Sequence, residues 1–252
     1  MKFFNDLLLQ IRRFKRANNL GFSFVRTKTF ELPTHLKIGK RKLRVFLPDE
    51  KGIIELFRDI LLDDEYWLEC IPVHEIKSIL DIGANVGIFS MAARIRFPES
   101  SIHAYEPNLQ VKKHLDHQAS AFGFKVMYEA IGSREGKGNL IANRGCDTAA
   151  QVNVQGDGNI TITSLSKAID QHEHGTVDLL KLDCEGHEHQ IIDENQATQV
   201  LNRCRYISME YHLGPEMRQC QLTRKLEAIG FEILKTSSRN QVIGNILAKN
   251  VR

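Results

Sequence analysis

The sequence predicts an α/β fold in which helices cover both faces of a mostly parallel sheet. From residue 77 onward, short apolar runs alternate with amphipathic stretches of helical length, the pattern of strands joined by helices. Two apolar runs near the end of the chain are separated only by a turn, which indicates one antiparallel strand. The 252 residues, 42% of them hydrophobic, are enough for one large domain with a packed core. A composition this hydrophobic excludes a mainly disordered chain.

The first quarter of the chain lacks the regular alternation of strands and helices that is predicted for the rest. We expect four elements in it: a helix over 2–17, strands over 27–32 and 42–47, and a helix over 52–62. This part is therefore predicted to be an N-terminal helix/strand extension, residues 1–62, placed before a main domain of residues 63–252.

The extension is strongly basic. Residues 1–50 contain twelve Lys and Arg against four acids, a net +8 in a chain of net +3, so the remainder carries −5. A basic arm on a mildly acidic body favours an anionic partner or surface, although a solvated basic face explains the same charges.

The main domain is expected to alternate strands with helices. Its first half should contain a strand over Ser78–Ile82, a helix over Ile88–Arg96, and strands over 102–105 and 125–131 with a helix closed by Gly123 between them. A hairpin and loop are expected over 133–160. After it we expect a strand over Val177–Leu182, a helix through Ile191 and Val200, a strand over 205–209, a helix through Leu222 and Ile229, and closing strands over 231–234 and 242–247.

A glycine turn follows the first predicted strand of this domain. Residues 80–87 read L-D-I-G-A-N-V-G, so Asp81 precedes a turn bounded by Gly83 and Gly87. Glycines let the backbone approach a ligand beside a helix N-terminus. The spacing G-x-x-x-G is not the G-x-G-x-x-G of dinucleotide enzymes, and an acid would repel a pyrophosphate. An acid suits a ligand with an amino group, such as the methionine part of S-adenosylmethionine.

Glu106 ends the next predicted strand, nineteen residues after Gly87. In nucleotide-binding α/β sheets an acid at this place accepts hydrogen bonds from ribose hydroxyls. A glutamate at a strand end is also a common solvated turn residue, but its spacing from the glycine turn favours the ribose role.

Acids and histidines follow two later strands. Asp183 and Glu185 point to the same side if the backbone is extended, and so do Glu210 and His212. The carboxyl ends of parallel strands are where such sheets bind ligands. Helix capping and a surface histidine would explain any one of these residues, but four such groups on neighbouring strand ends favour a catalytic site.

These segments, in this order, resemble the FkbM family of S-adenosylmethionine-dependent methyltransferases. The resemblance covers roughly residues 60–250 and includes Glu65-Tyr66, Tyr105-Glu106-Pro107, Ala130-Ile131-Gly132 and the K-x-D-x-E-G-x-E segment at 181–188, in which His187 stands where the family usually has a small residue. It implies a class I methyltransferase (Rossmann-like) seven-stranded sheet and O-methylation of a hydroxyl on a sugar, lipid or secondary metabolite. The residues expected to bind S-adenosylmethionine are Asp81, Gly83, Ala84, Asn85, Gly87, Glu106, Ile131 and Asp183.

Methyl transfer to a hydroxyl also needs a group that removes the proton. The candidate catalytic residues are Asp183, Glu210, His212 and Glu185, and because oxygen donors and an imidazole gather there, a divalent metal is possible but unsupported. Two alternatives stay open. One is a non-catalytic methyltransferase-like module that binds a partner, and the other, disfavoured by the glycine spacing, is a nucleotide-dependent oxidoreductase.

The N-terminal helix has two interpretations. Its apolar stripe of Phe3, Leu7, Leu8, Ile11 and Phe14 would usually pack on the main domain. With basic residues opposite, it would also suit peripheral contact with a membrane. No nucleic-acid partner is expected, and the oligomeric state is not encoded in any motif. Five scattered cysteines without C-x-x-C, and no convincing signal peptide, predict reduced thiols in a cytoplasmic protein.

Overall fold

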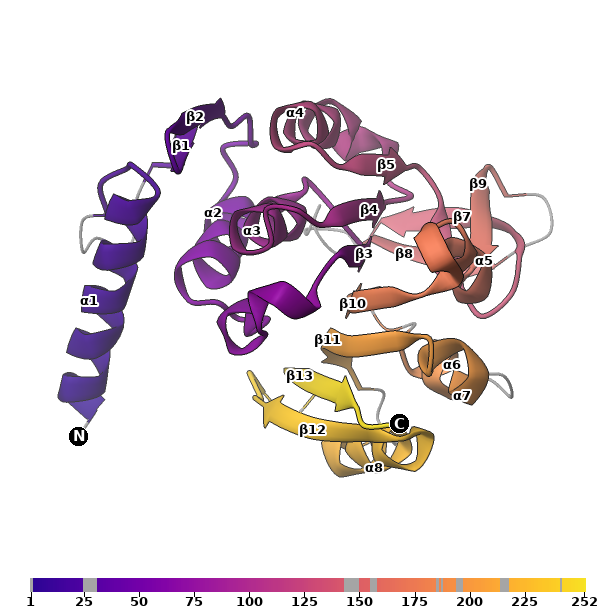
Figure 1. The fold of residues 1–252 in the computed structure, drawn as a ribbon. Coiled ribbons are helices and arrows are strands. Elements are labelled where there is room, and N and C mark those ends of the chain that lie inside the picture. Colours follow the sequence, from indigo (N-terminus) through magenta and orange to yellow (C-terminus); the bar gives the residue numbers. More distant parts are fainter. Residues whose placement is uncertain are drawn as a thin grey trace.

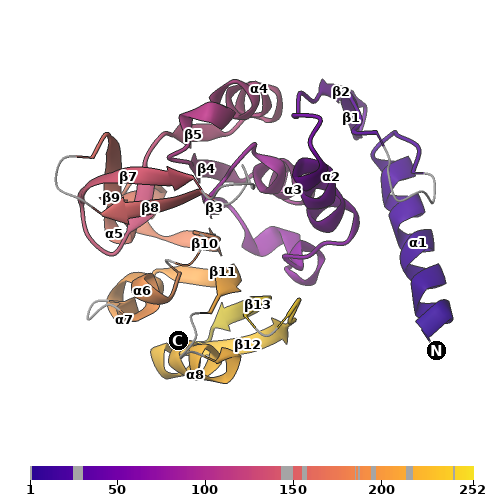
Figure 2. The same ribbon diagram turned by 180° about the vertical axis from the view of Figure 1, so that it is seen from behind.

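The fold is described from a computed structural model, which places residues 2–24, 31–142, 150–154, 158–184, 186, 188–193, 197–213, 218–240 and 242–252. The strand expected over 27–32 falls mostly outside these residues. The order of elements along the chain and their arrangement in space are shown in Figures 1 and 2.

A seven-stranded sheet forms the centre of the molecule (Figure 1). Its strands, in spatial order, are β12 (Phe231–Thr236), β13 (Ile243–Asn250), β11 (Cys204–His212), β10 (Val177–Leu182), β3 (Ser78–Ile82), β4 (Ser101–Tyr105) and β5 (Lys125–Met127). β13 runs antiparallel to the other six strands, which all point the same way. The predicted fold class is therefore confirmed, including the single antiparallel strand.

Helices cover both faces of this sheet, and alternation along the strands explains why. Ile79 and Leu179 belong to one core, and their neighbours Leu80 and Leu180 to the other. The first face is covered by α2 (Lys51–Phe57), α3 (Ile88–Arg96) and α4 (Lys112–Phe122). The second is covered by α5 (Leu165–Asp170), α6 (Glu188–Asp193), α7 (Ala197–Leu201) and α8 (Gln219–Ile229). Apolar runs in the central strands are thus buried on both sides.

The region predicted as a hairpin and loop contains more structure than expected. β7 (Gly136–Ala142) and β8 (Ala150–Val154) form the hairpin, and β9 (Ile160–Ser164) pairs with both β7 and β6 (Ala130–Gly132). The single strand predicted over 125–131 is wrong, because the chain leaves the central sheet after β5 and enters this second, four-stranded sheet as β6.

The N-terminal part is not packed as one separate unit. α1 (Lys2–Asn19) is followed by the hairpin of β1 (His35–Ile38) and β2 (Arg41–Arg44), and α2 continues into a π-helical turn at Arg58–Leu62. Ile53 and Phe57 of α2 belong to the same core as Phe89 of α3. The boundary at residue 62 stays a prediction, but α2 shares its packing with the main sheet.

The packing interpretation of the apolar stripe on α1 is wrong. Leu7, Leu8, Ile11 and Phe14 are all exposed, and the helix contacts the rest of the molecule through its opposite side. The side chain of Phe3 lies outside the described residues. Among the residues that the structure describes, no helix has the length and apolarity needed to span a membrane.

Candidate active site

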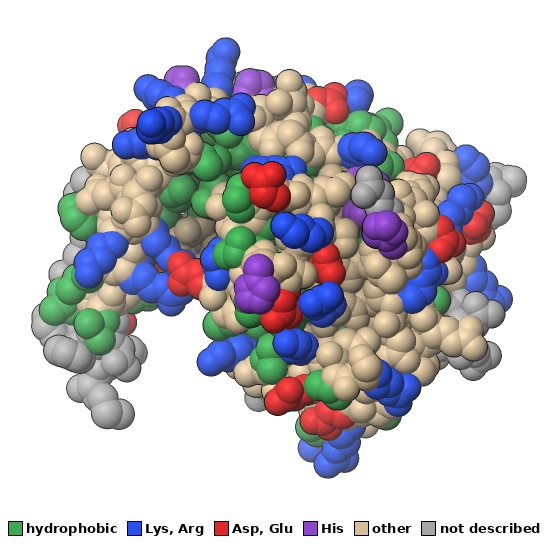
Figure 3. Space-filling view, viewed as in Figure 1, with side chains coloured by type: hydrophobic (Ala, Val, Ile, Leu, Met, Phe, Trp, Pro, Cys, Tyr) green, Lys and Arg blue, Asp and Glu red, His purple; other side chains and the backbone are tan. Residues whose placement is uncertain are grey.

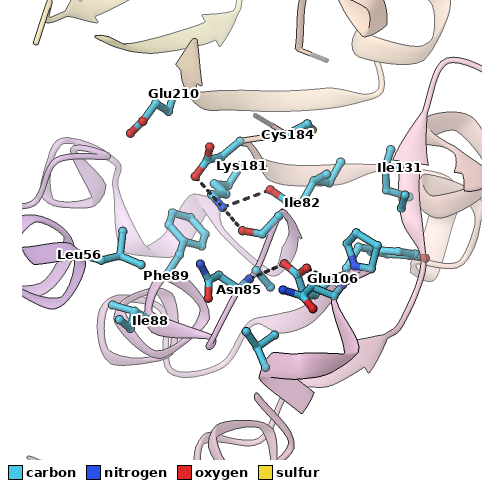
Figure 4. Close-up of a pocket in the computed structure, with 18 of the residues that line it drawn as sticks. Leu56, Ile82, Asn85, Ile88, Phe89, Glu106, Ile131, Lys181, Cys184 and Glu210 are labelled. Atoms are coloured by element: carbon cyan, nitrogen blue, oxygen red, sulfur yellow. Dashed lines mark hydrogen bonds and ion pairs between the residues drawn. The ribbon is translucent and has the colours of Figure 1, made fainter. Parts of the chain in front are cut away.

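The strand order places a crevice at the carboxyl ends of β3 and β10. From β3 the chain continues to β4 and then β5, which lie on one side of β3 in the sheet. On the other side of β3 lies β10, which is followed by β11, so the chain connections run away from each other between β3 and β10. Ligands of open α/β sheets bind at such a point. A cavity of about 320 Å³ lies there, lined by α2, the β3–α3 turn, the end of β4, β6, the segment after β10 and β11 (Figure 4).

The glycine turn after β3 forms the floor of the cavity. Gly83 has a φ of +77°, and a Cβ on it would lie 1.8 Å from the carbonyl oxygen of Asp183. The N–H groups of Gly83 and Ala84 both donate to the carbonyl of Tyr105, at 3.0 Å each. This close approach joins the ends of β3, β4 and β10, so any side chain on Gly83 would separate them.

Glu106 lies beside this turn and is 8% exposed. Its Oε2 accepts from the N–H of Asn85 at 2.7 Å (Figure 4). Its Oε1 accepts from the N–H of Asn108 at 2.8 Å. Burial raises the pKa of Glu106, and these two backbone bonds oppose the rise. A carboxylate has about four acceptor positions, so each oxygen keeps one for a ligand hydroxyl.

Asp81 lies beneath the turn rather than in the cavity wall. It is fully buried, its Oδ2 accepts from Ser90 Oγ at 2.7 Å, and its Oδ1 is 3.3 Å from Nζ of Lys181. From the sequence, Asp81 is predicted to face the ligand's amino group. In the structure its carboxylate instead balances the charge of a buried lysine.

Lys181 joins the two central strands at their carboxyl ends. It is 2% exposed, and its ammonium donates to the carbonyls of Gly83 at 2.6 Å and Ile82 at 3.1 Å (Figure 4). Burial alone would lower the pKa of Lys181, but Asp81 and Asp183 outweigh burial and raise it. The lysine therefore stays charged and fixes both the turn and the Asp183 carboxylate.

Asp183 presents its carboxylate to the cavity directly after β10. Its Oδ2 accepts from the hydroxyl of Tyr66 at 2.9 Å and lies 3.4 Å from Nζ of Lys181. Its Oδ1 has no hydrogen-bond partner among the described residues. Oδ1 is itself buried, and the side chain as a whole is 18% exposed, so the carboxylate is held in a fixed position in the cavity wall.

His212 and Glu210 share a face of β11, as predicted, but they differ in position. Glu210 lines the cavity and His212 does not. The His212 ring lies between two carboxylates, with Nε2 3.4 Å from Glu210 and Nδ1 3.5 Å from the buried Glu188. Burial alone would lower the pKa of His212, but hydrogen bonds with Glu188 and Glu210 raise it to about 11. The imidazole is therefore protonated at neutral pH.

Asp183, Glu188 and His212 also form the one group of described residues whose spacing suits a metal ion, with ligand atoms within 4.8 Å of one another. A metal would need the neutral imidazole. The Glu188 carboxylate already accepts from the N–H groups of Cys184 and Gly186, and the imidazolium supplies positive charge. The geometry therefore favours an ion-paired histidine over a metal ligand.

The structure brings together most of the predicted site residues. Those lining the cavity are Gly83, Ala84, Asn85, Glu106, Ile131, Asp183 and Glu210. Those not lining it are Asp81, Gly87 and His212. Gly87 instead begins α3 with a φ of +86°, and a Cβ there would lie 3.0 Å from Leu115. Glu185 and His187 lie outside the described residues.

Several residues of the site were not among those predicted from the sequence. Lys181 has a detectable signal, because it is a charged residue in the otherwise apolar end of a buried strand. Tyr66, Leu56 of α2 and Asp59 of the π-helical turn after it reach the site only through the tertiary fold. So does Arg239, which pairs with Glu210 at 3.5 Å.

A family model described as the methyltransferase FkbM domain matches residues 81–235, more than half of the chain. The chain belongs to the FkbM methyltransferase family. The match begins at Asp81 and includes the glycine turn, Glu106, Asp183 and Glu210. An oxidoreductase is thereby set aside.

Comparison with solved structures agrees with this assignment. The METTL16 MTase domain is similar to this FkbM domain with a TM-score of 0.53 at 13% identity, covering 83% of this chain and 74% of that one. A SAM-dependent methyltransferase from Aquifex aeolicus has a TM-score of 0.43 at 12% identity, covering 81% and 100%. At 13% identity, the likeness to the METTL16 MTase domain shows the class I methyltransferase fold and nothing more.

One curated relative matches a short segment. The antimetabolite synthetase AmbE of Pseudomonas aeruginosa is 27% identical over 77 residues, which is 31% of this chain and 4% of that protein. The chain thus spans a small fraction of this relative's length.

The methyltransferase family to which the chain belongs implies S-adenosylmethionine as the cofactor, and the residues present fit it. The Gly83 turn leaves no room for a side chain, and Glu106 keeps one acceptor position on each oxygen for the two ribose hydroxyls. Apolar groups from Ile88 and Ile131 line the same cavity and suit the flat adenine ring. Bound there, the cofactor supplies an electrophilic methyl group on its sulfonium.

Proposed function

We propose that this FkbM methyltransferase methylates a hydroxyl oxygen of a small acceptor, with Asp183 as the residue that takes up the hydroxyl proton. The observation that carries the proposal is the position of the Asp183 carboxylate in the cavity wall. Tyr66 and Lys181 hold its Oδ2, and the side chain is 18% exposed. A fixed carboxylate that lines the cavity is suited to orient a hydroxyl for in-line attack and to accept its proton.

The proton and the methyl group balance in this scheme. The acceptor oxygen forms a bond to the methyl carbon while the carbon–sulfur bond breaks, and the hydroxyl proton moves to Asp183. His212 is not suited to be the base, because its imidazole already carries a proton at neutral pH. Its contacts with Glu188 and Glu210 make it a positioning residue for the acidic wall.

The outer wall of the cavity supports a hydroxylated acceptor, such as a sugar, a lipid with a hydroxylated headgroup or a secondary metabolite. It combines apolar Leu56 with the carboxylates of Asp59, Glu129 and Glu210, all hydrogen-bond acceptors for hydroxyls. These carboxylates would repel phosphates, so we do not propose a nucleic-acid acceptor. The segment shared with an antimetabolite synthetase supports a secondary metabolite among the three classes.

We also propose a cytoplasmic location. Cys70, Cys204 and Cys220 are present as thiols rather than disulfides, as suits a reducing compartment.

A radiolabelled-methyl screen over hydroxylated sugars, lipids and metabolites tests the proposed reaction, with S-adenosylhomocysteine measured as the second product. Methylation of a hydroxyl gives an ether, so the product methyl should be stable to base. A methyl ester would instead be labile to base. Label found on nitrogen or on nucleic acid would contradict the proposal. Cofactor binding without turnover on any cellular extract would favour the non-catalytic binding module.

A further inference from the structure

The N-terminal helix α1 is attached to the molecule by its basic side. Arg13 Nε donates to Asp63 at 2.7 Å, and Arg16 donates to the carbonyl of Leu62 at 2.8 Å and pairs with Glu69. Ala17 is fully buried on the same side. The arginines that a solvated amphipathic helix would turn outward are therefore used to fix α1 in place.

The apolar side of α1 consequently faces outward. Leu7, Leu8, Ile11 and Phe14 are 40%, 50%, 41% and 52% exposed, and helical spacing places them on one continuous stripe. Figure 3 shows apolar side chains gathered over this helix. Single exposed apolar residues are ordinary, but a contiguous apolar stripe marks a surface that is covered by something else.

Next to this stripe lies the β1–β2 hairpin, which is basic throughout. It is joined to the end of α1 by the bond from the N–H of Lys37 to the carbonyl of Leu20, at 2.7 Å. Residues 35–44 contain no acid, and five exposed cations form no ion pair with any described residue: Lys37, Lys40, Arg41, Lys42 and Arg44. In Figure 3 this basic cluster and the apolar stripe appear on the same face of the molecule.

We propose that the stripe on α1 and the β1–β2 hairpin together bind the surface of an anionic lipid bilayer. An apolar helix face inserts at the boundary between headgroups and acyl chains, and neighbouring lysines and arginines are attracted by anionic lipids. Charge argues against a second copy of the chain as the occupant, because it would bring another unpaired basic hairpin to the contact. A bilayer supplies both the apolar layer and the opposite charge.

Binding to vesicles tests this proposal independently of the methyl-transfer reaction. The full chain is sedimented with vesicles of phosphatidylcholine alone, or with about one third phosphatidylglycerol. We expect binding to the anionic vesicles, weakened as salt shortens the Debye length from about 10 Å at 0.1 M to about 3 Å at 1 M.

Two pairs of substitutions separate the two parts of the surface. Leu8→Ser with Phe14→Ser, and Lys40→Glu with Lys42→Glu, should each lower the partition coefficient by about tenfold or more. Leu109→Ser and Lys235→Glu are matched controls on exposed side chains elsewhere and should leave it unchanged. All four positions in the test pairs are exposed, so the fold should tolerate them, and thermal unfolding checks this.

Absence of wild-type binding to anionic vesicles would overturn the proposal, as would unchanged binding in either pair of variants. Light scattering examines the remaining occupant. A dimer that becomes a monomer on Leu8→Ser with Phe14→Ser would mean that a second copy covers the stripe, and the bilayer proposal would be wrong.

Discussion

Asp183 and His212 lie close together, yet their charges suit different roles. The Asp183 carboxylate is held by Tyr66 and lines the cavity, whereas the His212 ring lies outside the cavity lining, between Glu188 and Glu210. Because the carboxylates raise the pKa of His212 to about 11, it is an imidazolium across the range in which enzymes are usually assayed. Removal of each residue should therefore change turnover differently.

We expect Asp183→Asn to lower kcat by about 10²–10⁴, because the amide keeps the hydrogen bond from Tyr66 but accepts no proton. His212→Gln should lower kcat less, and the acid limb of the pH profile of kcat/KM should persist in this variant. Methyl transfer to an acceptor found in the screen, measured from pH 5 to 9, checks both expectations.

Asp116→Asn, an exposed position on α4, is a control for loss of a carboxylate and should keep wild-type turnover. If His212→Gln lost as much turnover as Asp183→Asn and also lost the acid limb, the imidazole would be the base and our assignment would be reversed.

At the scale of elements, the strand–turn–helix from β3 to α3 depends on Gly83. We expect Gly83→Ala to abolish cofactor binding and to lower the free energy of unfolding well beyond the cost of backbone strain alone, because its Cβ would lie 1.8 Å from a backbone oxygen. Thermal unfolding and titration with S-adenosylhomocysteine measure the two effects.

Gly123→Ala is the matched control. Its φ of +73° is close to that of Gly83, but no atom lies within 4 Å of the added Cβ. This variant should lose only about 1–2 kcal/mol of unfolding free energy to left-handed strain and keep cofactor binding. If Gly83→Ala and Gly123→Ala lost the same unfolding free energy and bound the cofactor equally well, the close contact of Gly83 with Asp183 would be unimportant.

Elements whose signals are local could be predicted from the sequence. The helix expected over Ile88–Arg96 has those bounds in the structure, because Gly87 at its start and the apolar spacing lie within the segment. The change of sheet after β5 could not be predicted, because β6 pairs with β9, about thirty residues later, and no local pattern records that partner. For the same reason the sequence left open whether the stripe of α1 faces inward or outward, since its orientation depends on arginine contacts with Asp63 and Glu69.

The candidate site follows the same division. Gly83, Glu106 and Asp183 are recognisable because each ends a strand within a spaced motif. The ring of Tyr66 meets Asp183 across 117 residues of chain, and only the completed fold shows that contact. Asp81 was placed against the ligand because the buried partner of its charge, Lys181, comes from another strand.

At the scale of the whole molecule, a buried histidine pair makes stability depend on pH. The rings of His103 and His172 stack with centroids 3.9 Å apart, and His172 is 4% exposed. Burial, with the neighbouring charges of His103 and Lys125, lowers the pKa of His172 to about 4. The unfolded chain therefore binds a proton near pH 6.5 that the folded chain does not bind until about pH 4.

Stability should consequently fall as the pH falls through this window. Between pH 7 and pH 5 we expect His172 to account for a loss of about 2 kcal/mol in unfolding free energy. Urea unfolding at several pH values measures it. His172→Gln should reduce the slope between pH 6.5 and pH 4, whereas His74→Gln, at an exposed position, should keep it. A slope unchanged by His172→Gln would contradict the assignment.

In this cavity we assign binding of the cofactor to Glu106 and uptake of the acceptor's proton to Asp183. Calorimetric titration of S-adenosylmethionine into the wild type, Glu106→Gln and Asp183→Asn tests it most directly. Glu106→Gln should weaken binding by about 1–3 kcal/mol, because hydrogen bonds to a charged group are lost. Asp183→Asn should bind nearly as tightly as the wild type. Tight binding by Glu106→Gln, or loss of binding in Asp183→Asn, would contradict the roles assigned here.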